Sequence, residues 1–149
     1  MKIAIGSDHA GFEMKAEFIK QLKSWGHDVQ DFGAHSAESV DYPDIAEPLC
    51  QAVVSGACDR GVVICGTGIG MSIAANKVKG IRCSLCSESY SARLTREHND
   101  SNVLSIGARV TGIELALDIL KTYLETEFPA AERNARRIQK IQSIEERQA

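Results

Sequence analysis

Short apolar runs alternate in this sequence with longer stretches in which apolar residues recur every three or four positions. The short runs predict five strands, at residues 2–6, 27–33, 60–65, 81–86 and 103–107. The longer stretches predict helices, at residues 12–25, 42–55, 71–78, 87–98 and 111–128. Because strands and helices alternate with short connections, we expect right-handed crossovers and a parallel sheet with helices on both faces. The predicted fold is therefore α/β: a single Rossmann-like three-layer sandwich over residues 1–149.

The segment at residues 130–149 departs from this alternation. Ile138, Ile141 and Ile144 stand three residues apart among charged side chains, which predicts a helix with a narrow apolar stripe. This helix has no strand of its own to cover, so its stripe needs another surface. We expect it to pack on a partner subunit.

Composition narrows the class of partner. A net charge of -3 does not favour a nucleic acid, which usually selects a basic excess. No apolar run approaches the roughly 18 residues that span a bilayer. Gly6, Asp8 and His9 interrupt the first apolar run too early for a secretion signal. We therefore expect a cytoplasmic protein with no membrane or nucleic-acid partner.

The five cysteines form an odd set, which argues for reduced thiols rather than a disulfide framework. Cys83 and Cys86 match the spacing C-x-x-C, but they lie on a predicted strand. Positions three apart on a strand point to opposite faces, so a redox or zinc pair is disfavoured. Two buried strand cysteines explain the spacing better.

Three polar loops are expected at the edge of the sheet where the strands end, at residues 6–11 (GSDHAG), 65–70 (CGTGIG) and 96–100 (REHND). The dinucleotide fingerprint fails, because Met71 and Ile73 stand where it needs a small residue. The P-loop pattern fails at Phe12. We expect no metal and no cofactor, because consecutive polar residues at 98–100 cannot all face one point from a helix.

A glycine-rich loop before a helix can bind an anion through its backbone N–H groups, although its glycines can equally serve close packing. Cys65 precedes this loop, where it could act as a base or nucleophile or remain an inert buried thiol. Arg133 and Arg137 are spaced i, i+4 and could grip a phosphate together, or form a solvated helix face. Arg109, just past the fifth predicted strand, is either a further phosphate ligand or a salt-bridge residue.

In combination, these motifs resemble the B-type ribose-5-phosphate isomerases and their relatives acting on allose or galactose 6-phosphate. The resemblance spans almost the whole chain and rests on GSDHAGF, SVDYPD, ICGTGIGMSIAANK, GIRC, REHNDSNVLSIGAR and the late arginine pair. It implies a metal-independent aldose–ketose isomerase that works through an enediol and forms a homodimer, or a dimer of dimers, with active sites between subunits. The alternatives are a hexose 6-phosphate isomerase and a sugar-phosphate-binding module without turnover.

The resemblance also implies residue roles. Cys65 is the base that moves a proton between C1 and C2, Thr67 assists at the reacting oxygen, and His98 of a neighbouring subunit opens the sugar ring. The substrate-binding residues implied are Asp8, His9, Gly66, Gly68, Ile69, Gly70, Asn99, Arg109, Arg133 and Arg137.

One segment departs from the family pattern. Relatives commonly carry two glycines before the first phosphate arginine, whereas this chain has Ala130, Ala131 and Glu132 before Arg133. Some relatives use a carboxylate base on the helix after the glycine loop, but here that position holds alanine. Cys65 therefore has no competitor for the role.

Overall fold

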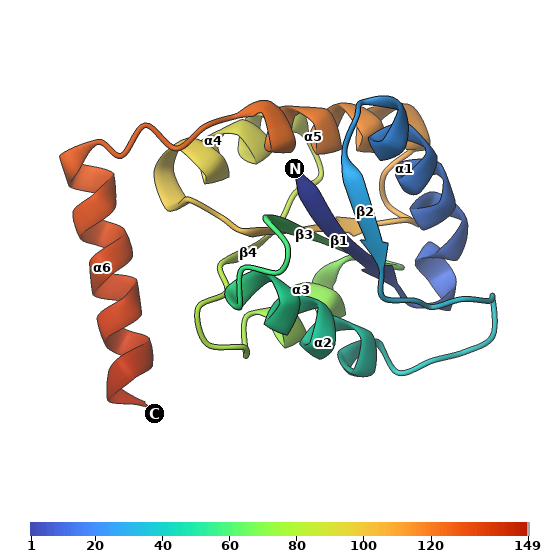
Figure 1. Cartoon of the computed structure of the whole chain (residues 1–149), viewed down its shortest axis with the longest axis horizontal. Helices are drawn as coiled ribbons and strands as arrows, with labels where there is room; N and C mark the ends of the chain where they lie inside the picture. Colours follow the sequence, from blue (N-terminus) through green and yellow to red (C-terminus); the bar gives the residue numbers. More distant parts are fainter. Residues whose placement is uncertain (149) are drawn as a thin grey trace.

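The computed structural model describes residues 1–148, which contain a five-stranded parallel sheet (Figure 1). The strand order is β2–β1–β3–β5–β4. The strands are β1 (Lys2–Ser7), β2 (Asp28–Asp31), β3 (Arg60–Cys65), β4 (Cys83–Leu85) and β5 (Val103–Gly107). All four neighbouring pairs are parallel, which confirms the predicted sheet.

Helices cover both faces of the sheet (Figure 1). Their bounds are α1 (Phe12–Ser24), α2 (Tyr42–Val54), α3 (Ile69–Ala75), α4 (Ser89–Asn99), α5 (Ile113–Glu125) and α6 (Glu132–Arg147), with a short 3-10 helix η1 (His9–Gly11) before α1. Strand residues alternate between two cores, so that Ile3 and Ile5 pack with α1, α4 and α5, whereas Ala4 packs with α2 and α3. The three-layer α/β sandwich is therefore confirmed.

The two outer strands are shorter than predicted. We expected strands at residues 27–33 and 81–86, whereas β2 and β4 hold four and three residues. Both lie at the edges of the sheet, where only one neighbour supplies ladder hydrogen bonds. Cys83 packs toward the α2–α3 core and Cys86 lies in the opposite core, so the C-x-x-C thiols do face opposite ways.

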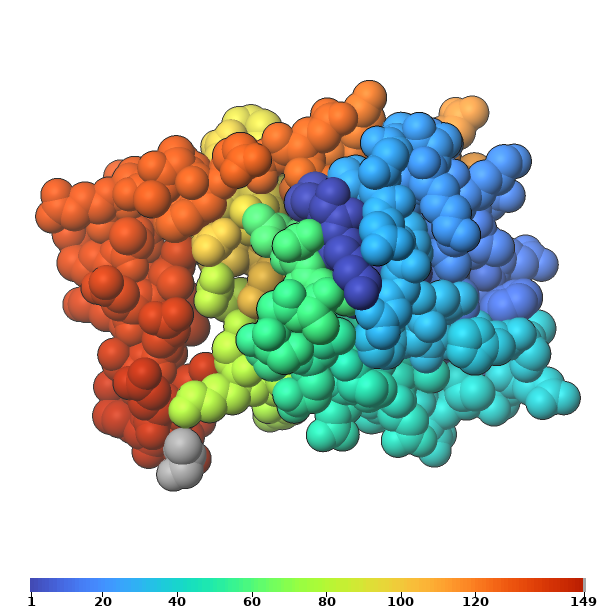
Figure 2. Space-filling view, in the orientation of Figure 1, coloured from blue at the N-terminus to red at the C-terminus, as the bar shows by residue number. Residues whose placement is uncertain are grey.

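The last helix, α6, stands apart from the sandwich (Figure 1), and the space-filling view shows a hollow between the two (Figure 2). Its first turn lies against the end of α4, where the Asn134 side-chain amide approaches the Glu97 carbonyl at 3.5 Å. Near its other end, both Glu145 carboxylate oxygens accept from the Gly80 N–H at 3.0 Å. Ile138 is buried, but Ile141 and Ile144 are 46% and 49% exposed. Of the helices formed by residues 1–148, none has the length and apolar character of a membrane span.

Candidate active site

Cys65 ends the central strand β3 and is 5% exposed. The Gly68 N–H donates to its Sγ at 3.1 Å, and the Ile69 N–H donates to Thr67 Oγ1 at 3.2 Å. A backbone donor aimed at sulfur stabilises negative charge on it. The glycine loop therefore folds around the thiol rather than away from it.

Glycine is required at two points of this fold. Gly68 has φ +78, and a Cβ there would lie 2.9 Å from the backbone carbon of Ile106. A Cβ on Gly107 would lie 2.5 Å from the Thr67 carbonyl oxygen, so β5 and the loop pack backbone to backbone. Ser105 Oγ donates to the Gly68 carbonyl at 2.6 Å. Ser105 is not among the predicted site residues, and its signal in the sequence is a hydroxyl inside an otherwise apolar strand.

Asp8 and His9 follow β1 directly and share this edge. The strand order reverses between β1 and β3, and ligands of open α/β sheets bind at such points. Asp8 is 8% exposed, and its Oδ1 accepts from the N–H groups of Ala10 and Gly11 at 2.9 and 3.2 Å. His9 Nδ1 accepts from the Val40 N–H at 3.4 Å. This bond ties the loop after β2 to the same corner.

Arg109 and Tyr42 border the two ends of the loop. The Arg109 N–H donates to the Gly66 carbonyl at 2.9 Å, and a Cβ on Gly66 would lie 3.5 Å from Arg109 Cδ. A Cβ on Gly70 would lie 2.7 Å from Tyr42 Cζ, so the tyrosine ring covers the start of α3. Tyr42 was not singled out from the sequence. We call the residues gathered here the carboxyl-edge group: Asp8, His9, Cys65, Gly66, Thr67, Gly68, Ile69, Gly70 and Arg109.

His98 and Asn99 lie at the opposite edge of the sheet, so the expectation that residues 96–100 share the Cys65 edge is wrong within one chain. The Asn102 carbonyl accepts from the Gly61 N–H at 2.9 Å, which places the α4–β5 connection at the start of β3. Gly61 and Cys65 are separated by about 13 Å of strand. The physical reason is that residues 96–100 lead into a strand instead of following one.

Arg133 and Arg137 belong with His98 rather than with Cys65. Both are exposed in the first two turns of α6, which begins beside the end of α4. The four residues His98, Asn99, Arg133 and Arg137 form what we call the amino-edge group. The predicted site residues thus fall into two groups on opposite edges of the sheet.

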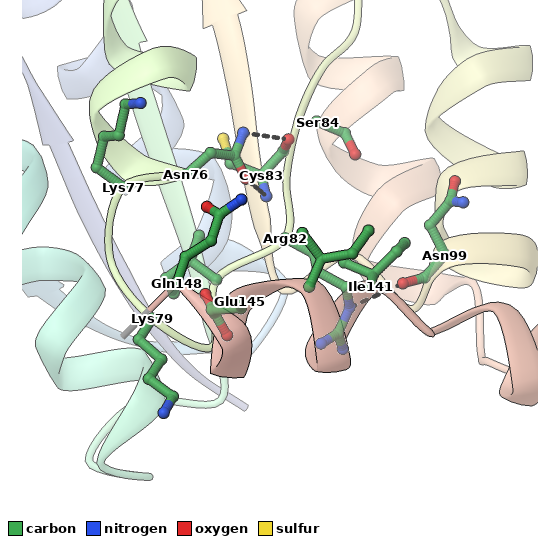
Figure 3. Close-up of a pocket in the computed structure, with 12 residues that line it drawn as sticks. Asn76, Lys77, Lys79, Arg82, Cys83, Ser84, Asn99, Ile141, Glu145 and Gln148 are labelled. Atoms are coloured by element: carbon green, nitrogen blue, oxygen red, sulfur yellow. Dashed lines mark hydrogen bonds between the residues drawn. The ribbon is translucent and has the colours of Figure 1, made fainter. Parts of the chain in front are cut away.

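A cavity of about 630 Å³ lies between α6 and the edge strand β4 (Figure 3). Ile141 and Glu145 line it from α6, and Arg82, Cys83 and Asn99 line it from the sandwich. Cys65 does not border this cavity. The hollow beneath α6 is therefore separate from the glycine loop of the same chain.

The other cysteines are held as neutral thiols. Burial raises the pKa of Cys50 to about 12 and, together with the Glu88 carboxylate, that of Cys86 to about 11. Burial also raises the pKa of Cys58 and Cys83. Because thiolates are the reactive form, these four positions are poor bases and nucleophiles.

The carboxyl-edge group combines three chemical capacities. Cys65 can accept a proton, the loop N–H groups can stabilise charge on an oxygen, and Arg109 offers a cation. Within residues 1–148, no group of three or more His, Cys, Asp or Glu side chains could hold a metal ion. Proton transfer next to a polarised carbonyl is the chemistry these groups support.

Comparison with known proteins gives the family. Residues 3–141 match the family model described as Ribose/Galactose Isomerase. Ribose-5-phosphate isomerase B of Escherichia coli is 48% identical over 98% of this chain and 97% of its own length. The solved ribose-5-phosphate isomerase B of Clostridium thermocellum has a TM-score of 0.98 and 56% identity, with both chains fully covered. The Mycoplasma genitalium enzyme, solved with bound ribulose 5-phosphate, has a TM-score of 0.93 and 35% identity over 97% of this chain and 96% of that one. The chain therefore belongs to the ribose/galactose isomerase family.

Proposed function

We propose that this protein interconverts ribose 5-phosphate and ribulose 5-phosphate through an enediol, in the cytoplasm and without a metal or other cofactor. The observation that carries the proposal is the Cys65 thiol, held 3.1 Å from the Gly68 N–H inside the glycine loop. The names and the bound sugar phosphate of the relatives described above support the choice of a pentose.

The reaction needs only proton movement. Cys65 takes the proton from C2 of the open-chain aldose while the C1 carbonyl oxygen gains one, which gives the enediol. The proton then goes to C1, and the C2 hydroxyl loses its own proton to become the ketone carbonyl. Thr67 and the loop N–H groups other than those of Gly68 and Ile69, which already donate to Cys65 Sγ and Thr67 Oγ1, stabilise the charge that develops on oxygen. No electron acceptor or donor is required.

The amino-edge group has a place in this scheme only if it comes from a second copy. His98 would open the sugar ring of a substrate held by the partner's Cys65 loop, and Asn99 would bind beside it. Arg133 and Arg137 would grip the phosphate together with Arg109, while Asp8 and His9 bind the sugar hydroxyls. Charge-assisted bonds from arginine to phosphate are strong and fix the reacting carbons in register.

The same geometry supports a homodimer, or a dimer of dimers, with active sites between subunits. About 13 Å of strand separates the two edges, so one chain cannot bring both groups to one sugar phosphate. Ile141 and Ile144 remain about half exposed above the cavity beside β4. We propose that α6 packs on the partner with these side chains, as each copy contributes the same surface in a two-fold dimer.

Turnover with a chelator present tests the function. The purified protein should form ribulose 5-phosphate from ribose 5-phosphate at the same rate with EDTA as without it. Allose and galactose 6-phosphates, the longer alternatives, should be converted far more slowly. A folded sample that leaves ribose 5-phosphate untouched but converts a hexose 6-phosphate would overturn the pentose assignment. Inhibition by EDTA would overturn the metal-independent mechanism.

A further inference from the structure

Arg96 is a buried cation two residues before His98. Its side chain is 2% exposed, and it lies on α4 with its guanidinium 5.8 Å from the Tyr123 ring centroid. Burial of a charge is costly unless partners offset it. A buried arginine at this position is therefore stable only if specific partners offset the cost of burying its charge.

Three acceptors surround this guanidinium. Nη1 donates to Asp100 Oδ1 at 2.8 Å and to the Ser101 carbonyl at 2.5 Å, and Nε donates to the Thr126 carbonyl at 3.2 Å. The planar fork of arginine can reach acceptors in different directions at once, whereas a lysine ammonium is a single point. The contact set is specific to arginine.

The Arg96 contacts join two parts of the chain. Asp100 and Ser101 directly follow His98 and Asn99 at the end of α4. Thr126 directly follows α5 and begins the connection that leads to Arg133 and Arg137 in α6. One buried side chain thus links the two segments that carry the amino-edge group.

The backbone at this junction is held in an uncommon conformation. Asp100 has φ +44, in the left-handed region that few non-glycine residues occupy. Its carboxylate also accepts from Arg82 Nη2 at 3.3 Å, and its carbonyl accepts from the same nitrogen at 2.8 Å. Such a conformation persists only where its surroundings hold it. Arg82 and Arg96 are those surroundings.

We propose that Arg96 is a positioning residue, which sets His98 and the Arg133–Arg137 pair at the spacing that one sugar phosphate requires. It touches no reacting atom and acts through the ends of α4 and α5. This inference rests on the proposed function, because it assigns Arg96 to the half of the active site that serves the partner's Cys65.

Kinetics of the variant Arg96→Lys give the first test. Lysine keeps the charge but cannot reach all three acceptors, so kcat/KM for ribose 5-phosphate should fall by about 10- to 100-fold. Arg93→Met, on the same helix, removes an exposed pair with Glu97 and a contact with the exposed Tyr90 ring, and its kcat/KM should stay within about twofold of wild type. Leu22→Ala, on the buried face of α1, reports what lost stability alone does to kcat and KM at 25 °C.

Complementation gives the second test. A variant that had only lost stability would not recover activity in a mixed dimer. A mixed dimer of Arg96→Lys and Cys65→Ala holds one site in which Cys65 and the whole amino-edge group are intact. An equal mixture with exchanged subunits should therefore recover about a quarter of wild-type activity. Where Arg96→Lys does not fold, Asp100→Asn takes its place, since asparagine tolerates the left-handed backbone.

Two results would overturn the inference. Wild-type kcat and KM in Arg96→Lys would remove the positioning role. The second result compares two mixtures. If His98→Asn mixed with Cys65→Ala recovers activity but Arg96→Lys mixed with Cys65→Ala does not, Arg96 acts elsewhere and the proposed function stands. If neither mixture recovers activity, the shared site is wrong, and the role of Arg96 in it is wrong as well.

Discussion

Replacing Gly68 by alanine should damage stability and catalysis together. The residue has φ +78, and an added Cβ would lie 2.5 Å from Leu85 Cδ1, 2.9 Å from the backbone carbon of Ile106 and 3.0 Å from the Gly107 nitrogen. The leucine tip can move, but the two backbone atoms belong to β5. The loop must therefore shift, and the N–H that donates to Cys65 Sγ shifts with it.

Gly26 supplies a matched control for the magnitude. It has φ +86, and a Cβ there would meet nothing within 4 Å. Gly26→Ala should thus lower the free energy of unfolding only by the penalty for a left-handed backbone at a residue with a Cβ, about 1 to 2 kcal/mol. Gly68→Ala adds the clash, a further 1 to 3 kcal/mol or so. For a chain of this length, each kcal/mol lowers Tm by about 2 to 4 °C.

The assay compares thermal unfolding and steady-state kinetics for the two variants. Gly26→Ala should keep wild-type kcat/KM for ribose 5-phosphate, whereas Gly68→Ala should lose about 100-fold, because a shift of about 1 Å in a catalytic group has that effect. Equal Tm losses and equal activities in the two variants would refute this reading of the glycine loop.

Three further predictions concern single side chains. Iodoacetamide at neutral pH should alkylate Cys65 before Cys50 and Cys86, because burial raises the pKa of those two thiols to about 12 and about 11; peptide mass spectrometry reports the order, and earlier labelling of Cys50 would contradict it. Arg137→Met should raise KM for ribose 5-phosphate by about 10- to 100-fold with little change in Tm, since the lost contact is a charge-assisted bond to phosphate; an unchanged KM would exclude Arg137 from the phosphate site. Desolvation and, secondarily, the terminal ammonium lower the pKa of His27 below its usual 6.5, although Glu125 opposes them. The unfolded chain therefore takes up this proton more readily than the folded one. The contribution of His27 to the free energy of unfolding should be fully present above pH 6.5 and should be lost as the pH falls below it. Tm measured at pH 8 and pH 5 should differ less in His27→Gln than in the wild type, and an equal difference would count against this role.

The sequence predicts those parts of the molecule that follow local rules. The β-branched runs that became β1, β3 and β5 are buried on both faces, and hydrophobicity alone marks such strands. Edge strands are half exposed, so their ends could not be read from the pattern. Asp8 and Arg109 follow strands and Cys65 ends one, which is why these residues could be placed at one edge.

The amino-edge group was expected at the wrong edge, although the same rule applies to it. His98 lies near the end of a helix that leads into β5, and such a connection lies at the amino edge of a parallel sheet. Arg96 shows a second limit, because a charged residue between Thr95 and Glu97 looks like surface in the sequence. Its burial follows from the acceptors that Asp100, Ser101 and Thr126 provide, and these come from packing.

The most direct test of the central claim is complementation between Cys65→Ala and His98→Asn. Each variant alone should be nearly inactive with ribose 5-phosphate, because every homodimer site then lacks either the base or the ring-opening histidine. After subunit exchange, an equal mixture should recover about a quarter of wild-type activity, since about half of the dimers are mixed and each of those holds one intact site. Activity in the mixture no greater than the sum of the two variants would contradict a site in which Cys65 of one subunit works with His98 of the other.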